Sequence, residues 1–439
     1  METCCEQGQI CPHYDIIVVG AGIAGLYVVR ELLKKHPGWR IALAERYKGL
    51  GGRTYSYSPP EFPGIRWEMG AGRVRKDHTL AMGLLKEYGL HWIPIGTGTE
   101  FLERPGGPLV PNPFETGFIP VFLEPLSRLP SSVLAVNTIE SLMKQAYGSE
   151  KTQRILETFP YRAEVTTLRA DLALEAFLGK GEMGSHEGYG VVKEGFGELV
   201  ARMRDDIERR GATILPRHRL LNLKAVPGGG GSEKGTNLEF EYGYDGKKIQ
   251  LRALKGVVLA LHKDAVAEIP AFRDWKLLRR LKTQPLLRTY AIFPVTAGKS
   301  WFTGFQRIVT PERPRYILPI DASKGVIMIS YTDADDTTEY MRIQKKGGDK
   351  ALERTILGDV RRLFPDLEIP KPLFFRSHPW ETGATYWLPG DYDPATESKK
   401  ACLGIQSLPN VYLCGESWSM RQAWVEGALE HARACLEKL

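Results

Sequence analysis

Residues 14–25 have the sequence Tyr-Asp-Ile-Ile-Val-Val-Gly-Ala-Gly-Ile-Ala-Gly, with glycines at positions 20, 22 and 25. The apolar run 16–19 predicts a buried parallel strand, and the segment after Gly25 predicts a helix. Glycines in the turn between them let the backbone approach a pyrophosphate at the positive end of the helix. Glu45 closes a second predicted strand, 40–44, at the distance where a carboxylate accepts hydrogen bonds from an adenosine ribose. This pattern predicts an α/β domain that binds a dinucleotide.

A second glycine-containing segment, Gly51-Gly52-Arg53, indicates which dinucleotide the chain binds. Its glycines allow another backbone segment to reach the cofactor, and its arginine can neutralise a phosphate. The spacing from Glu45 to this triplet resembles that of the flavin-containing amine oxidases, the superfamily of monoamine oxidase, polyamine oxidase and L-amino-acid oxidase. The resemblance implies that the cofactor is FAD. The family also has an arginine two residues before the glycine pair, where this chain has Gly49, so one phosphate contact of the family lacks its usual residue.

The other end of the chain supports the same resemblance. Residues 411–416, Val-Tyr-Leu-Cys-Gly-Glu, are similar to the late strand of the family, whose Gly-Glu approaches the ribityl–pyrophosphate part of FAD. Residues 422–428 resemble the segment that opens the last helix beside the flavin ring, and residues 220–223 resemble an edge near the adenine. The resemblance implies these FAD contacts: Gly20, Gly22, Gly25, Glu45, Gly52, Arg53, Gly70, Ala71, Gly72, Arg73, Leu220, Gly415, Glu416, Ala423, Trp424 and Val425.

The mode of FAD attachment follows from a missing residue. The sequence around 380–390 resembles the segment of monoamine oxidases that carries a covalent flavin–cysteine link. No cysteine occurs between Phe375 and Thr396 in this chain. We therefore expect FAD to be held noncovalently.

Length and composition exclude several classes of protein. The 439 residues predict two or three structural units, and the 43% apolar and 25% charged residues are typical of a soluble globular chain. The net charge of +7 is modest and the basic residues are scattered, so we expect no nucleic-acid partner. No run approaches the ~18 apolar residues that a membrane helix needs, so we expect no membrane partner.

Cysteines and termini bear on metal binding and location. The six cysteines, at positions 4, 5, 11, 402, 414 and 435, have no metal-ligand spacing, so we expect no metal site and reduced thiols. The N-terminus lacks the apolar core of a signal peptide, which favours a cytoplasmic protein. The final Glu-Lys-Leu resembles a peroxisomal signal but has Glu437 where a small residue is expected, so that location has only weak support. The sequence leaves open whether the protein is a monomer or a homodimer.

The fold class that we expect is α/β, with two interleaved domains. A Rossmann-like FAD-binding domain, of the amine-oxidase or glutathione-reductase-2 type, should comprise residues 1–75, 188–265 and 375–439. An α+β substrate-binding domain should comprise 76–187 and 266–374. We further expect a helix at 79–88, loops at 96–130, a helical subdomain at 131–178 and a flexible hairpin tip at 228–231.

Arg73 indicates a class of substrate. Monoamine and polyamine oxidases generally have no arginine at this position near the flavin, whereas L-amino-acid oxidases have a Gly-x-x-Arg that Gly70 and Arg73 match. A guanidinium binds a carboxylate through two parallel charge-assisted hydrogen bonds, so this arginine favours amino acids over simple amines. The alternative is that Arg73 binds a flavin phosphate or a structural acid.

Two other residues complete the predicted substrate site. Tyr331 ends an apolar strand that resembles the one whose tyrosine contacts the substrate carboxylate in L-amino-acid oxidases, although a tyrosine at a strand end is often structural. Trp424 matches the aromatic residue that stands over the flavin in the superfamily, and Trp387 or Tyr386 could form the facing wall. Such walls exclude water and guide the substrate.

One family feature is absent. The superfamily usually places a lysine near flavin N5, on the strand before a Trp-Phe or Phe-Trp pair. In this chain that pair is Trp301-Phe302, and no lysine lies between Lys282 and Lys299, so Ile292 or a near neighbour takes the lysine's place. Either oxygen reactivity is reduced, or Arg288 or another cation substitutes.

The resemblance implies an FAD-dependent L-amino-acid oxidase. Such an enzyme transfers the α-hydrogen of an amino acid, whose amine is neutral, to flavin N5. Water then hydrolyses the oxidised product to a 2-oxo acid and ammonia. Molecular oxygen reoxidises the flavin and becomes hydrogen peroxide. Arg73 and Tyr331 would orient the carboxylate, and Trp424 would form the wall of the pocket. Two alternatives remain: an amine or polyamine oxidase with a structural Arg73, and an FAD-binding homologue with weak oxidase activity.

Overall fold

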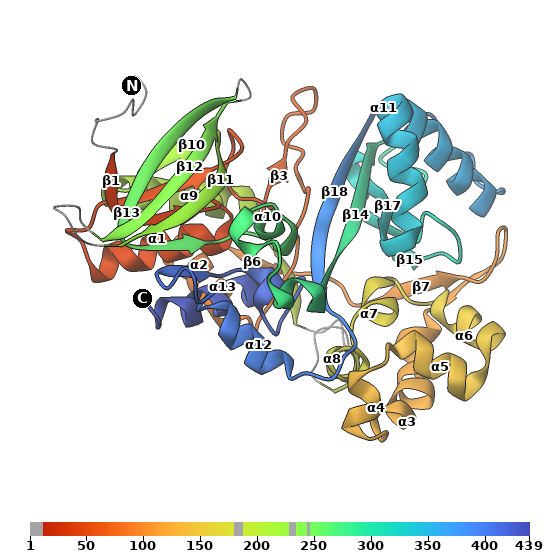
Figure 1. Ribbon diagram of the computed structural model, residues 1–439. Helices are drawn as coiled ribbons and strands as arrows, with labels where there is room; N and C mark the ends of the chain where they lie inside the picture. Colours follow the sequence, from red (N-terminus) through yellow and green to blue (C-terminus); the bar gives the residue numbers. More distant parts are fainter. Residues whose placement is uncertain (1–11, 180–187, 228–233, 244–245) are drawn as a thin grey trace. The chain divides into compact units, whose positions relative to one another are not determined.

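The computed structural model describes residues 12–179, 188–227, 234–243 and 246–439, and the chain forms two compact units (Figure 1). The first unit comprises Met1–Pro94, Gly188–Thr283 and Tyr392–Leu439. The second comprises Ile95–Glu187 and Gln284–Asp391. Each unit is therefore built from segments that are distant in the sequence.

The first unit has a seven-stranded sheet. Its parallel strands are β10 (Thr213–Pro216), β2 (Ile41–Glu45), β1 (His13–Val19), β13 (Lys247–Leu259) and β19 (Val411–Leu413), where β19 pairs with β13. Two antiparallel strands, β12 (Gly235–Tyr242) and β11 (His218–Val226), extend the sheet beyond β13. The run 16–19 is buried in β1, as its apolar character predicts, and Ile16 and Val18 belong to the main hydrophobic core of the unit.

The main core of the first unit is shared by the helices α1 (Ile23–Lys35), α2 (Thr79–Glu87), α9 (Phe196–Arg209) and α13 (Val425–Leu436). In α9 the buried apolar residues recur every three or four positions, as in Phe196, Leu199, Met203 and Ile207. This spacing forms one apolar face, which packs into the same core as α1 and α13. The helix predicted at 79–88 agrees with α2 to within one residue.

Smaller elements complete the first unit. A two-stranded sheet pairs β3 (Ser56–Tyr57) with β4 (Trp67–Glu68), and a three-stranded one has the order β5 (Val74–Arg75), β9 (Tyr189–Val192), β6 (Trp92–Pro94). Short helices are α10 (Lys263–Ala267), η2 (Pro270–Phe272), η3 (Lys276–Arg280), α12 (Pro394–Ala401) and η5 (Glu416–Trp418). The predicted hairpin tip at 228–231 lies outside the described residues.

The second unit has its own seven-stranded sheet. The strand order is β18 (Phe374–Trp387), β14 (Leu281–Ile292), β17 (Val326–Asp333), β16 (Tyr316–Asp321), β15 (Arg307–Val309), β7 (Thr99–Leu102) and β8 (Leu109–Pro111). The short helix η4 (Ala322–Lys324) joins β16 to β17, and α11 (Ala334–Leu363) packs Tyr340, Leu352 and Val360 against this sheet. Gly348, at φ +66°, divides α11 into two helical segments at a kink.

Helices occupy most of 131–178, as the apolar spacing predicts. They are α4 (Ser131–Ala135), α5 (Ile139–Tyr147), α6 (Ser149–Leu156), α7 (Ala163–Thr166) and α8 (Ala170–Phe177). A capping box between Thr138 and Ser141 begins α5. Buried side chains such as Leu142 and Phe177 face inward among these helices.

The expectation that 96–130 forms loops is wrong. This stretch contains β7, β8, the π-helical segment η1 (Phe114–Leu123) and α3 (Glu124–Ser127). Its glycines and prolines are typical of loops. Strand β7 forms nevertheless, because it pairs with β15, about two hundred residues later in the chain. Partners so far away leave no local signal in a sequence.

The boundaries of the two units differ from those of the predicted domains. Residues 76–94 and 266–283 lie in the first unit, and 375–391 lie in the second. The physical reasons are plain at two of these segments. Leu84 and Leu85 of α2 pack into the core of the first unit, and β18 pairs with β14 in the second unit's sheet.

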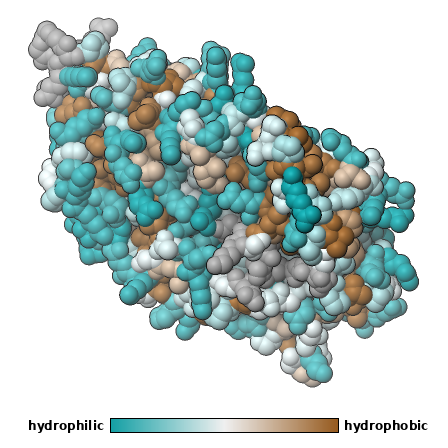
Figure 2. Space-filling view, turned by 90° about the horizontal axis from the view of Figure 1, so that it is seen from below, coloured by the Kyte–Doolittle hydropathy of each residue, from teal (hydrophilic) through white to brown (hydrophobic). Residues whose placement is uncertain are grey.

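The outer surface is more polar than the cores. On the face drawn in Figure 2, hydrophilic residues predominate and hydrophobic residues form smaller groups between them. Within the described ranges, none of the helices has both the length and the apolar content needed to cross a bilayer. The three cysteines in the described ranges, Cys402, Cys414 and Cys435, are buried free thiols.

Candidate active site

The glycine turn after β1 has a geometry that only glycine allows. Gly20 has φ +100°, and a Cβ atom on Gly25 would lie 1.9 Å from the carbonyl oxygen of Gly20. Gly22 pairs with Gly51, and the amide of Gly51 donates to the carbonyl oxygen of Ala21 at 2.8 Å. Gly52 has φ +57°, and a Cβ on it would come within 3.3 Å of the Cα of Gly22. The two glycine-rich segments therefore form one close-packed cradle.

The N-terminus of α1 opens from this cradle. The N-cap residue is Gly22, which has no side chain to cap the helix, and the first turn has no acidic residue. Backbone N–H groups at a helix N-terminus carry a partial positive charge and bind phosphate oxygens. The arrangement of glycines and helix therefore fits a pyrophosphate, as the sequence predicts for FAD.

Glu45 lies at the end of β2 beside this turn. One carboxylate oxygen accepts the amide of Ala21 at 2.9 Å and the other accepts the amide of Tyr47 at 2.9 Å. Burial raises the pKa of Glu45 above 4.5, and the hydrogen bonds from these amides oppose that rise. The residue thus fixes the glycine turn against β2, which places its carboxylate where the ribose contact is predicted. That contact stays a prediction.

Arg53 and Glu416 form an ion pair across 363 residues of sequence. Arg53 Nη1 donates to Glu416 Oε2 at 2.9 Å, and the amide of Ala423 donates to Glu416 Oε1 at 2.9 Å. The amide of Ala71 donates to the carbonyl oxygen of Arg53 at 2.9 Å. Four residues of the predicted FAD site, from three distant stretches, therefore lie together in the first unit.

The backbone at both ends of the 415–424 segment has left-handed conformations. Gly415 has φ +124°, and Ala423, an unusual residue for this region, has φ +66°. The Glu416 carboxylate stabilises the turn at Ala423 by accepting its amide. Val425 follows as the first residue of α13. Strain of this kind concentrates at functional sites, which agrees with the predicted role of the segment.

The remaining predicted FAD contacts lie in less constrained places. Gly70 and Gly72 flank Ala71 in the irregular segment between β4 and β5. Leu220 lies on β11 opposite Phe240 of β12, within the antiparallel part of the sheet. The predicted adenine contact of Leu220 stays a prediction.

Arg73 and Trp424 are close neighbours in the first unit. The guanidinium carbon of Arg73 lies 5.5 Å from the centre of the Trp424 ring and 5.2 Å from that of Tyr189. The two rings stack at 5.6 Å with an angle of 26° between their planes, and His78 meets Trp424 edge-on at 5.5 Å. These four residues form a cation and aromatic cluster, which we call the Trp424 cluster.

Tyr331 belongs to the second unit. It lies on β17 opposite Arg288 of β14, whose guanidinium carbon is 5.0 Å from the centre of the tyrosine ring. Tyr161 packs edge-on against the same ring at 5.4 Å. Burial raises the pKa of Tyr331 far above its usual value, so its hydroxyl stays protonated at neutral pH. A protonated phenol is a hydrogen-bond donor.

An acidic residue follows Tyr331 on the same strand. Asp333 accepts the amides of Arg162 and Ala163 at 2.9 and 3.1 Å, which caps the start of α7. Burial raises the pKa of Asp333 to about 6, against the lowering effect of these backbone amides. This carboxylate has a structural role, because it joins β17 to the start of α7.

Three other residues considered from the sequence are buried in the second unit. Trp387 has no exposed surface, and the hydroxyl of Tyr386 donates to Glu164 at 3.1 Å. Ile292, which stands near the expected lysine position, is also buried at the end of β14. Trp387 is therefore a core residue.

Sequence reasoning missed Tyr189, His78 and Glu426. Glu426 is 1% exposed and accepts the amides of Leu80 and Ala81 at 2.9 and 2.8 Å. The only signal for it was an acid among apolar residues at the start of a helix. Tyr189 and His78 carried no signal, because their role depends on packing against Trp424.

Comparison with known proteins gives the same family along the chain. The model of the family described as flavin containing amine oxidoreductase matches residues 23–435. The (S)-6-hydroxynicotine oxidase of Paenarthrobacter nicotinovorans is 36% identical over 102 residues, which are 23% of this chain and 24% of that enzyme. The L-amino-acid oxidase of Siganus canaliculatus is 22% identical over 96% of this chain and 85% of its own length. The tryptophan 2-monooxygenase of Agrobacterium vitis is 23% identical over 98% of this chain and 67% of its own length.

Solved structures agree on the fold. A putrescine oxidase bound to putrescine matches with a TM-score of 0.72 at 15% identity, over 98% of this chain and 99% of that one. The likeness confirms the α/β fold class expected for an FAD-dependent amine oxidase. Since the family model covers nearly the whole chain and the glycine cradle fits a pyrophosphate, this protein belongs to the flavin-containing amine oxidoreductase family, and FAD is its cofactor.

Proposed function

We propose that this protein is an FAD-dependent L-amino-acid oxidase, which converts an L-amino acid, water and molecular oxygen into a 2-oxo acid, ammonia and hydrogen peroxide. The observation that carries the proposal is a guanidinium, that of Arg73, beside the aromatic pair Trp424 and Tyr189 in the unit with the FAD cradle. The similarity to an L-amino-acid oxidase along 96% of the chain supports it.

Arg73 would select the substrate. Its guanidinium is partly enclosed by the Tyr189 and Trp424 rings, whose electron-rich faces attract the cation. This contact limits the movement of the side chain, so less conformational entropy is lost when a carboxylate binds. Two parallel N–H···O bonds to the carboxylate would then fix the orientation of the α-carbon.

Tyr331, which the resemblance predicts as a substrate contact, is a candidate hydrogen-bond donor in the second unit. Its raised pKa keeps the hydroxyl protonated and therefore able to donate. Arg288 lies over the tyrosine ring and brings another positive charge to that strand pair. This cation, rather than the family's lysine, would supply the positive charge in the substrate-binding unit.

The reaction needs little further acid or base chemistry from the chain. FAD, when bound, supplies the two-electron oxidation of the carbon that bears the amine. The amine must enter neutral, because a cationic nitrogen disfavours loss of hydride from its carbon, and no side-chain base is assigned to this step. Trp424 and Tyr189 would exclude water from one side of the substrate.

A second candidate function is oxidation of amines without a carboxylate. The observation that favours it is the same packing of Arg73 on two aromatic rings, which by itself gives the arginine a structural role. In that case the substrate would be a monoamine or polyamine. A third reading, an FAD-binding homologue with weak oxidase activity, follows from the missing lysine between Lys282 and Lys299.

The experiment that separates these functions uses the purified yellow protein. Steady-state release of peroxide is measured with the L- and D-amino acids and with a set of monoamines and polyamines. The proposal requires activity with at least one L-amino acid and little with its D-enantiomer. Activity confined to amines would establish the second candidate. Failure of every compound to bleach the flavin under anaerobic conditions would favour the third.

A further inference from the structure

The start of α2 is capped by a residue from another helix. Glu426, in the first turn of α13, accepts the amides of Leu80 and Ala81, and its Oε1 also lies 3.4 Å from the hydroxyl of Thr79. The residue at the N-cap position of α2 is His78, whose side chain makes no capping hydrogen bond. A Ser, Thr, Asp or Asn within the helix's own sequence usually satisfies these amides. Here they depend on a carboxylate 346 residues away in the chain.

The Glu426 carboxylate is favoured electrostatically at this place. It lies in the first turn of α13 and accepts two amides in the first turn of α2, so the positive ends of two helices act on it. It is also almost fully buried, at 1% exposure. Loss of the charged acceptor would deprive the partly buried N–H of Leu80 and the buried N–H of Ala81 of this partner, which is costly. The contact therefore fixes α2 and α13 to each other strongly.

The segments that Glu426 joins carry the Trp424 cluster. Trp424 is the N-cap residue of α13, two positions before Glu426, and His78 is the N-cap residue of α2. Arg73 lies five residues before His78, and the intervening β5 pairs with β9 through Arg75 and Tyr189. Every member of the cluster is therefore attached to one side or the other of this contact.

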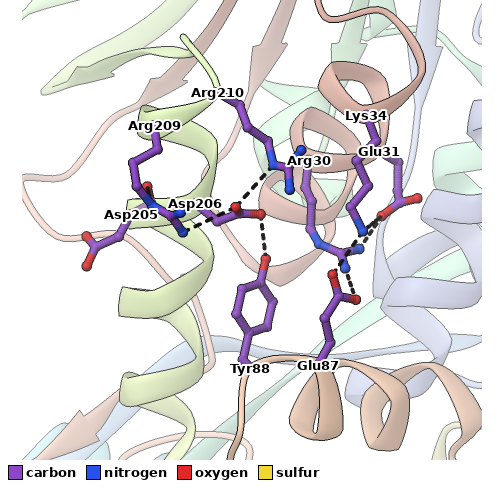
Figure 3. A network of polar contacts seen from close by, with 9 residues as sticks. All are labelled: Arg30, Glu31, Lys34, Glu87, Tyr88, Asp205, Asp206, Arg209 and Arg210. Atoms are coloured by element: carbon purple, nitrogen blue, oxygen red, sulfur yellow. Dashed lines mark hydrogen bonds and ion pairs between the residues drawn. The ribbon is translucent and has the colours of Figure 1, made fainter.

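The far end of α2 has a separate attachment, drawn in Figure 3. Glu87, the last residue of α2, forms ion pairs with the buried Arg30 and, at 3.0 Å, with Lys34, both on α1. Tyr88, which follows, donates to Asp206 of α9 at 3.0 Å. These contacts also hold α2 in the first unit, but they lie at the opposite end of the helix from the Trp424 cluster. They provide a matched control.

We propose that Glu426 is a positioning residue for substrate recognition. By holding the start of α2 against the start of α13, it keeps Arg73, His78 and Trp424 in one arrangement. The guanidinium of Arg73 is then presented to the substrate carboxylate at a fixed place. The inference rests on the proposed function only for the identity of the group that Arg73 binds.

The test compares Glu426→Gln with Glu87→Gln in the FAD-loaded protein. A glutamine side chain at position 426 keeps one acceptor oxygen but has no charge. Its own N–H groups would face the backbone N–H donors of α2. We expect the KM for the preferred L-amino acid to rise about tenfold, with kcat and the Kd for FAD within about threefold. Glu87→Gln should lower Tm through the lost ion pairs and leave KM unchanged. Equal changes in KM for the two variants would overturn the proposal.

A double-mutant cycle with Arg73 distinguishes positioning from general stability. If Glu426 acts through Arg73, Glu426→Gln should raise KM by less than about twofold in an Arg73→Met background. Full additivity of the two substitutions would overturn the proposal. Should Glu426→Gln fail to fold, Glu426→Asp retains the charge with a shorter reach. It should give an intermediate KM, and an unchanged KM would count against the role.

Hydrogen exchange separates this proposal from the proposed function. Amides in 78–82 should exchange faster in Glu426→Gln than in the wild type, whereas Glu87→Gln should affect 84–89. Unchanged protection at 78–82 would overturn the positioning role whatever the substrate. Faster exchange at 78–82, in a protein that oxidises only amines, would exclude the amino-acid oxidase function. It would still support the attachment of α2 to α13 by Glu426.

Discussion

The guanidinium carbon of Arg73 lies 5.5 Å from the centre of the Trp424 ring, so a cation and an indole from stretches 351 residues apart meet in the first unit. Tyr189 extends the aromatic surface by stacking on Trp424. The same unit holds the glycine cradle and the ion pair of Arg53 with Glu416. The candidate carboxylate-binding group and the FAD cradle are therefore parts of one folded body.

Substitution of Gly25 tests the cradle. Gly25→Ala should weaken FAD binding strongly, since the new Cβ would lie 1.9 Å from the carbonyl oxygen of Gly20, and backbone atoms must shift to accept it. We expect a cost of at least about 3 kcal/mol, or more than about 100-fold in FAD affinity. Flavin fluorescence titration measures it. Gly38→Ala is the control, because no atom lies within 4 Å of the place that its new methyl group would occupy, and it should bind FAD normally.

Removal of Arg53 tests the link between the two cofactor segments. Arg53→Met should remove the ion pair with the buried Glu416 carboxylate and destabilise the 415–424 turn by about 3 kcal/mol. Thermal denaturation and FAD titration should both show the loss. As a control, Arg154→Met breaks the exposed pair of Arg154 with Glu150 and should cost at most about 0.5 kcal/mol. Similar losses from the two substitutions would contradict the role given to Arg53.

A buried histidine predicts the response to acid. Burial lowers the pKa of His431 from 6.5 to about 4, and its Nε2 donates to the carbonyl oxygen of Ser398 at 3.0 Å. Because the folded pKa is below the unfolded one, the stability from this group is complete above pH ~6.5. It is lost as pH falls toward about 4, with a slope of up to about 1.4 kcal/mol per pH unit.

The variant that tests this is His431→Gln, which keeps a donor for Ser398 but does not titrate. Urea denaturation at saturating FAD should show a shallower fall in the free energy of unfolding between pH 6.5 and 4. Burial also lowers the pKa values of His262 and His378, to about 4 and about 3, so part of the slope should remain. Identical slopes in the variant and the wild type would contradict the assignment.

Local patterns in the sequence were sufficient for the cofactor-binding parts of the fold. Strand β1, the glycine turn and α1 are contiguous, so alternation, glycine spacing and apolar runs determine them within about twenty residues. The spacing of Glu45 from the turn is likewise local. For the same reason the helices of 131–178 could be recognised.

Long-range packing explains what the sequence did not reveal. Strand β7 depends on β15, and the capping of α2 depends on Glu426, which is hundreds of residues away. Tyr189 became part of the candidate site only because it stacks on Trp424. Such pairs involve common residue types at unremarkable positions, so no local pattern distinguishes them.

The most direct test of the central claim compares two substrates that differ only by a carboxylate. The kcat/KM ratio of the preferred L-amino acid to the amine with the same side chain is measured for the wild type and Arg73→Met. Loss of the bidentate contact should lower the value for the amino acid by about 30- to 1000-fold, or about 2–4 kcal/mol, and change that for the amine by less than about threefold. Arg73→Lys should restore the kcat/KM for the amino acid only in part. Equal losses for both substrates, or loss of FAD from Arg73→Met, would contradict the claim and place Arg73 in the scaffold of the cofactor site.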